Sequence, residues 1–158
     1  AEIDGPVYIR VARPVCDEIT TADTPFIPGK ANVMKEGTDV CIIACGLMIP
    51  KALEAAAQLE KEGVSAAVVN MHTIKPIDKD IVLKMNETCK AIVTVEEHSV
   101  IGGLGSAVAE VLAGHDGAKF AMVGIQDKFG KSGKPDQLFE AYGLTAANVA
   151  AKAKELLK

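Results

Sequence analysis

Two carboxylates and a histidine stand next to one another at Glu96, Glu97 and His98, directly after a run of small apolar residues. Carboxylates beside an imidazole can transfer protons or coordinate a metal ion. A structural alternative stays open, because neighbouring side chains on a strand point to opposite faces and each carboxylate could cap a helix or pair with a lysine. The triplet therefore predicts either acid–base chemistry or a structural junction.

Three glycines follow the triplet, at Gly102, Gly103 and Gly105, and Ser106 comes next. The apolar residues after them recur at helical spacing, so we predict a helix that starts at this cluster. The N–H groups and dipole of a helix N-terminus attract anions, which makes these four residues a candidate anion site. The alternative is that the glycines let the helix start close to the sheet. The dinucleotide fingerprint fails here, because Val108 stands where a glycine or alanine is required.

The four cysteines predict neither a disulfide nor a metal site. Cys41 and Cys45 lie four residues apart on a predicted strand, which separates them by about 13 Å, too far for a disulfide. Cys16 and Cys89 have no Cys or His at the spacing of metal ligands. We expect Cys41 and Cys45 to be small buried residues, with a redox or metal pair as the alternative, and we predict no catalytic, cofactor-binding or metal-ligating residue in the chain.

A mostly parallel sheet must position these residues. Ala91, Ile92, Val93 and Val95 are small or β-branched and apolar, as in a strand covered on both faces. The polar triplet is predicted to follow the end of that strand. In such sheets, ligands bind beyond the carboxyl ends of the parallel strands. Those ends are predicted at Cys45-Gly46, Asn70-Met71-His72, Glu96-Glu97-His98 and Gln126-Asp127-Lys128.

The rest of the chain alternates between strands and helices. Residues 31–35 and 39–45 flank Gly37 so closely that we predict an antiparallel hairpin. Further strands are predicted at 66–70 and 120–125, and helices at 49–59 before Gly63, after Asp78, from Pro135 to Gly143 and after Thr145. The predicted fold class is α/β: a three-layer α/β/α domain around a five-stranded mixed sheet, mostly parallel with one antiparallel edge strand.

The first 30 residues differ from this pattern. Residues 5–14 alternate apolar and polar side chains as a half-buried strand does, and residues 15–30 are polar and interrupted by proline and glycine. We therefore divide the chain into the end of a preceding domain (1–14), a linker (15–30) and the main domain (31–158).

Composition excludes several classes of function. The 158 residues are 49% hydrophobic and 24% charged with a net charge of −4, and their lysines form no basic stripe of the kind that binds nucleic acid. No apolar run approaches the roughly 20 residues that span a bilayer, and the chain does not open like a secretory leader. We expect a cytoplasmic protein that binds neither nucleic acid nor membrane.

Three separate runs resemble the C-terminal domain of the transketolase family. They are VEEHSVIGGLGSAVAEV (95–111), QDKFGKS (126–132) and FEAYGLTAANVAAKAKELL (139–157). Residues 5–14 resemble the last strand of the pyrimidine-binding domain that precedes it in that family. The first run is also similar to 1-deoxy-D-xylulose-5-phosphate synthase, whereas the other two favour transketolase, including the kind split into two subunits.

The resemblance implies a parent enzyme that uses thiamine diphosphate and Mg²⁺ or another divalent cation. Such an enzyme is a homodimeric glycolaldehyde transferase of the pentose phosphate pathway, and it moves a two-carbon ketol unit between phosphosugars. The resemblance places cofactor and metal in the N-terminal and pyrimidine-binding domains or an N-terminal subunit. The present chain is then an assembly domain, with a possible regulatory role, that binds no cofactor and is inactive alone.

Two site predictions rest on this resemblance. Arg13 resembles the arginine that contacts the substrate phosphate, a task that suits its bidentate donors. The alternatives are that Arg13 is an ordinary surface arginine, or that Arg10 makes this contact in its place. Glu96, Glu97 and His98 are predicted to face a neighbouring domain or subunit.

Three rival functions remain at this point. A 2-oxo-acid dehydrogenase β subunit shares the domain plan. A stand-alone anion- or nucleotide-binding module would use residues 102–106. A dimerisation module would need no site at all.

Overall fold

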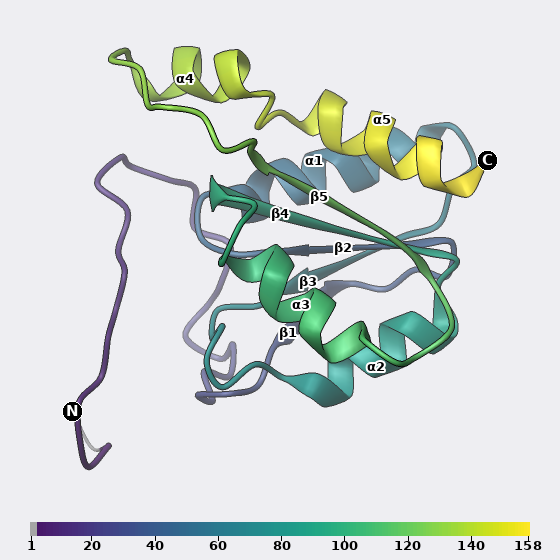
Figure 1. The fold of residues 1–158 in the computed structure, drawn as a ribbon, viewed down its shortest axis with the longest axis horizontal. Coiled ribbons are helices and arrows are strands. Elements are labelled where there is room, and N and C mark those ends of the chain that lie inside the picture. The colour runs from purple at the N-terminus through teal and green to yellow at the C-terminus, as the bar shows by residue number, and fades with distance from the viewer. Residues whose placement is uncertain (1–2) are drawn as a thin grey trace.

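The computed structural model describes residues 3–158 and shows a single five-stranded sheet between helices (Figure 1). The strands, in chain order, are β1 (Asn32–Lys35), β2 (Val40–Ala44), β3 (Ala66–Asn70), β4 (Ala91–Ser99) and β5 (Lys119–Ile125). Across the sheet they lie in the order β1-β3-β2-β4-β5. Only β1 is antiparallel to its neighbour, so the predicted mixed sheet is confirmed.

Helices cover both faces of the sheet, which confirms the three-layer α/β/α fold class (Figure 1). The helices are α1 (Met48–Lys61), α2 (Lys79–Thr88), α3 (Leu104–Leu112), α4 (Pro135–Tyr142) and α5 (Ala146–Leu157). One face packs against α1 and α5, and the other packs against α2 and α3. The central strands β2 and β3 are buried along their whole length as a result, which explains their continuous apolar sequence.

The predicted hairpin is wrong, because β1 pairs with β3 rather than with β2. The short connection after β1 passes the beginning of β3, and there a Cβ on Gly37 would overlap the backbone of Ala66 and Ala67. A glycine is therefore needed for one backbone to cross close to another. The same glycine had suggested a hairpin turn, so the sequence signal was real but its structural cause was different.

The polar triplet lies inside β4 and not beyond its end, which corrects the predicted boundary. The pairing with β5 shifts register between Val95 and Ser99, and Ser99 then pairs with Ile125. This irregularity changes which side chains point into the core. The strand therefore continues through Glu96, Glu97 and His98, although only Glu96 is buried.

Residues 5–14 do not form the predicted strand in this chain. Their apolar side chains are exposed, and Val11 is 82% accessible to solvent. Figure 1 shows this segment running apart from the body of the domain. Its long-range contact is a 3.5 Å hydrogen bond that the Arg10 guanidinium donates to the carbonyl of Glu97. A strand needs a neighbouring strand to satisfy its backbone, and this segment has none among the described residues.

The predicted helix ends are confirmed. Asp78 accepts a hydrogen bond from the N–H of Ile81 at the start of α2, and Thr145 accepts one from Asn148 at the start of α5. Gly63, which follows the C-cap residue Glu62 of α1, and Gly143, which is the C-cap residue of α4, adopt positive φ angles of 80° and 70°. All four cysteines are free, and Cys41 and Cys89 are buried whereas Cys16 is exposed. Among the described residues, no helix is long and apolar enough to span a membrane.

Candidate functional site at the carboxyl edge of the sheet

The junction between β4 and α3 is closed by Glu96. This side chain is buried, and its Oε2 accepts a 2.7 Å hydrogen bond from the N–H of Leu104, the first residue of α3. A carboxylate at this position satisfies an otherwise orphan donor and complements the positive end of the helix dipole. The structural alternative for Glu96 is therefore correct, because it caps a helix that offers no side chain of its own for the purpose.

The glycine cluster brings α3 against the sheet. A Cβ on Gly103 would overlap the Glu96 carboxylate, and one on Gly105 would lie 2.7 Å from the sulfur of Met122. The nearby donors are also engaged: Gly102 N–H donates to the hydroxyl of Ser106 at 2.8 Å, and that hydroxyl donates to a carbonyl. A packing role for these glycines follows directly. The anion site at this cluster stays a prediction, and an incoming anion would compete with Glu96.

Glu97 and His98 do not join Glu96 in one cluster of acids. Glu97 is exposed, whereas His98 is half-buried and places Nδ1 2.8 Å from the carbonyl of Ser99 and 4.0 Å from Glu96. Residues 3–158 contain no group of three or more His, Cys, Asp or Glu side chains arranged to hold a metal ion. The interface role of the triplet stays a prediction, and of its three residues only Glu97 and His98 present side-chain surface to a neighbour.

Cys45 stands beside Glu96, with its sulfur 3.9 Å from the carboxylate. Burial and the negative charge of Glu96 raise the pKa of the Cys45 thiol to about 12, although Arg10 opposes the shift. The thiol is therefore protonated near neutral pH and is a poor nucleophile.

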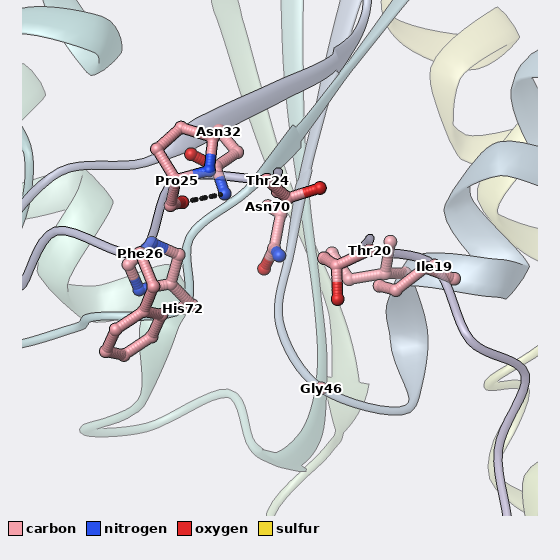
Figure 2. Close-up of a pocket in the computed structure, with 10 residues that line it drawn as sticks. Ile19, Thr20, Thr24, Pro25, Phe26, Asn32, Gly46, Asn70 and His72 are labelled. Atoms are coloured by element: carbon pink, nitrogen blue, oxygen red, sulfur yellow. Dashed lines mark hydrogen bonds between the residues drawn. The ribbon is translucent and has the colours of Figure 1, made fainter. Parts of the chain in front are cut away.

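A hollow lies next to this junction, beyond the carboxyl ends of β2 and β3 (Figure 2). Its volume is about 300 Å³. The lining combines both strand ends, the start of α1 and a segment from the predicted linker: Ile19, Thr20, Thr24, Pro25, Phe26, Asn32, Gly46, Ile49, Asn70 and His72. The strand-end rule placed Gly46, Asn70 and His72 here. It missed residues 19–26, whose sequence carries no signal that they fold back onto the sheet.

Two polar side chains of the hollow face mostly apolar neighbours. Asn70 is 7% exposed, and Figure 2 shows its carboxamide pointing into the space between Phe26 and Thr20. The His72 ring packs against the Phe26 ring at a centroid distance of 4.4 Å, and burial lowers its pKa, so it is neutral near pH 7. Arg13, the predicted phosphate contact, is exposed and lies outside this lining.

Comparison with known proteins identifies what the chain is similar to. Residues 29–149 match the family model described as the transketolase C-terminal domain. A 6-deoxy-6-sulfo-D-fructose transketolase subunit from Clostridium sp. (strain MSTE9) is 44% identical over 97% of this chain and 48% of its own length. A 1-deoxy-D-xylulose-5-phosphate synthase from Heliobacterium modesticaldum is 41% identical over 98% of this chain but 24% of its own length.

The solved structures give the same result. A split gene transketolase, described as an inactive β4 tetramer, superposes with a TM-score of 0.94 at 51% identity. The match covers 99% of this chain and 51% of that one. The chain thus spans about half the length of this structure and of the transketolase subunit that it matches.

Proposed function

The chain belongs to the family of transketolase C-terminal domains, and from that premise we propose that it completes a thiamine-diphosphate-dependent transketolase. In this proposal the parent is a cytoplasmic homodimer of the pentose phosphate pathway that transfers a two-carbon ketol unit between phosphosugars. The domain itself serves assembly and regulation of that enzyme rather than catalysis. The observation that supports this most strongly is the near-complete superposition on half of a split transketolase chain.

The residues described here do not fit thiamine diphosphate and its metal ion. A diphosphate needs cationic or free N–H donors, and the hollow is lined by no lysine or arginine among the described residues. No acidic or histidine cluster suits a divalent cation within residues 3–158. In the proposal this chain performs no catalytic step itself, and the cofactor is held by the N-terminal and pyrimidine-binding parts of the enzyme.

The exposed segment of residues 5–14 supports the proposed domain boundaries. Val7, Ile9 and Val11 alternate with polar residues and are 54%, 75% and 82% exposed. Apolar side chains at a period of two suit a strand with one covered face. We propose that residues 1–14 complete a sheet in the pyrimidine-binding domain, that 15–30 link it to this domain, and that 31–158 fold independently of it.

We propose one role for Arg13 and another for Glu97 and His98 at the boundary between the two domains. Arg13 is exposed, so its guanidinium is available to contact the phosphate of a substrate that is bound in the parent's active site. Glu97 and His98 lie on the surface near Arg10, which already contacts the Glu97 carbonyl. We propose that they face the domain or subunit that covers this edge.

A transfer assay tests the proposed function. The full-length protein, with its N-terminal subunit where the gene is split, is assayed with thiamine diphosphate, Mg²⁺, xylulose 5-phosphate and an aldose phosphate acceptor. We expect ketol transfer by this assembly and none by residues 1–158 alone. Decarboxylation of branched 2-oxo acids without ketol transfer would instead assign the β subunit of a 2-oxo-acid dehydrogenase.

The same assay tests Arg13. An Arg13→Ala variant of the full-length protein should raise KM for the phosphorylated donor with a smaller change in kcat, because a ground-state contact is lost. The matched variant Arg10→Ala should raise KM less, and a larger effect of Arg10→Ala would assign the phosphate contact to Arg10 instead. Equal kinetics for Arg13→Ala and the wild type would remove this residue from the proposal.

A further inference from the structure

The side chain of Asn70 is the feature of the domain that its fold does not explain. It is almost fully buried at the end of β3, yet its carboxamide makes no hydrogen bond to any residue of 3–158. Figure 2 shows it aimed into the hollow rather than into the core. Buried polar groups are nearly always paired in native proteins, so an unpaired one that faces a cavity points to a partner from outside the chain.

His72, on the same strand end, carries a second unsatisfied atom. Its Nδ1 lies 3.0 Å from the Thr73 hydroxyl, but its buried Nε2 has no partner within the described part of the chain. The Phe26 ring packs against the imidazole and forms one wall of the hollow. The Nε2 atom is too deeply buried to reach the space, which therefore combines one unpaired polar group, the Asn70 carboxamide, with aromatic and aliphatic walls, as small-molecule sites do.

An anionic ligand does not fit this space. The start of α1 borders the hollow, but Met48 N–H already bonds to Cys45 and Ile49 N–H to Gly46, while Pro50 has no N–H to offer. None of the ten lining residues is a lysine or arginine. A charged group would lose its water without gaining a compensating donor, so the ligand is neutral.

We propose that the hollow binds a small neutral planar ring with an amide-type edge, the class to which nicotinamide and the nucleobases belong. A carboxamide presents a donor and an acceptor side by side, and it pairs at two points with an edge that presents the same groups in reverse order. Ile19, Ile49 and Pro25 supply apolar contacts to the ring faces. The volume of about 300 Å³ lies at the small end of known ligand pockets and is sufficient for a single ring system, while the lack of a lysine or arginine in the lining disfavours a sugar phosphate.

This site is separate from the proposed transfer reaction and does not depend on it. It would give the domain an effector site about which the transketolase proposal says nothing. Its test therefore measures binding in the full-length protein, and a failure of ketol transfer has no bearing on the result.

Saturation-transfer NMR with nicotinamide and nicotinate tests the proposal. The two probes share one ring, and the second replaces the amide by a carboxylate. We expect nicotinamide to bind in the millimolar range, as suits a fragment of its size, and nicotinate at least about tenfold more weakly. A parallel pair, adenine and adenosine 5′-phosphate, distinguishes a free base from the base of a nucleotide.

Variants assign the binding to the hollow. Asn70→Leu should weaken nicotinamide binding by about tenfold or more, whereas Asn148→Leu, which changes an asparagine on α5, should leave it unchanged. Thr20→Trp alters an exposed rim residue and provides a second variant that blocks the entrance without touching the core. The proposal is overturned if neither nicotinamide nor adenine binds, if nicotinate binds equally well, or if both hollow variants bind like the wild type.

Discussion

The carboxyl edge of the sheet carries two junctions that differ in how their polar groups are satisfied. At the first, between β4 and α3, the Glu96 carboxylate fills the space in front of the helix and accepts the Leu104 N–H at 2.7 Å. At the second, between β2 and β3, Asn70 faces a hollow of about 300 Å³ with no partner among residues 3–158. The first junction has the more reactive residue types, yet its carboxylate is paired within the chain. We call it the closed junction, and we call the second, with its unpaired carboxamide, the open junction.

This difference shows why residue type alone does not locate a site. Acidic residues, a histidine and glycines at a strand end predict chemistry, yet here they join a helix to a sheet. An asparagine attracts little attention in a sequence, but a nearly buried carboxamide that faces a hollow without a partner among residues 3–158 is informative. The useful question is which polar groups the fold leaves unpaired.

The largest effect should come from a methyl group added to the closed junction. Gly103→Ala should lower the free energy of unfolding by about 3 kcal/mol, because its Cβ would overlap the buried Glu96 carboxylate and displace it from Leu104. Gly46→Ala is the matched change at the open junction, where no atom lies within 4 Å and only the φ of 56° is unfavourable, for about 1 kcal/mol. Urea denaturation measures both, and equal losses would contradict the contrast between the junctions.

Removing the carboxylate should have the next largest effect. Glu96→Leu leaves the N-terminus of α3 without its acceptor and should cost about 2 kcal/mol, since hydrogen bonds to charged groups are worth more than neutral ones. Glu96→Gln keeps an acceptor and should cost less. The control Glu97→Gln alters an exposed side chain and should stay within about 0.5 kcal/mol of the wild type. A stable Glu96→Leu protein would mean that the cap is dispensable.

The open junction should respond in the opposite direction. Asn70→Leu removes an unpaired buried amide from a β-strand, so the free energy of unfolding should rise by about 1 kcal/mol. Asn32→Leu, across the hollow, should instead lower it, because the Asn32 amide donates to the Pro25 carbonyl at 3.0 Å. Thermal unfolding of the two variants gives the comparison, and a loss of stability in Asn70→Leu would show that its amide is paired in solution.

The smallest effect appears only at alkaline pH. The pKa of Cys45 is raised to about 12 in the folded state, above its usual value of 9.0, so the contribution of the protonated thiol is fully present below pH 9 and is lost as the pH rises toward 12. Relative to Cys45→Ala, the wild type should therefore lose about 1 kcal/mol between pH 8 and pH 10. Parallel stability curves for the two proteins over that interval would exclude the raised pKa.

Local signals in the sequence were sufficient for most of the fold. Asp78 and Thr145 mark helix starts, and Gly63 and Gly143 mark helix ends, because caps depend on residues that are close in the chain. The strands followed from their apolar runs. The pairing of β1 with β3 could not be predicted, since Gly37 has the same residue type in a hairpin turn and in a close crossing.

The candidate sites were predictable to a lesser degree. The strand-end rule placed Asn70, His72 and Glu96 at one edge of the sheet. It could not show that Glu96 points back into α3 while Asn70 points away from the core, because side-chain direction depends on the bulge in β4 and on the packing of both helices. The docking of residues 19–26 over the hollow depends wholly on tertiary contacts.

The pairing of β1 with β3, which requires the close crossing at Gly37, also affects the order in which the sheet can assemble. Asn32 pairs with Asn70, 38 residues later (70 − 32), so during synthesis β1 emerges well before its partner. At roughly 5–20 residues per second, that interval is on the order of seconds. A strand of only four residues, with an asparagine at one end and a lysine at the other, offers little for another chain to pair with while it waits.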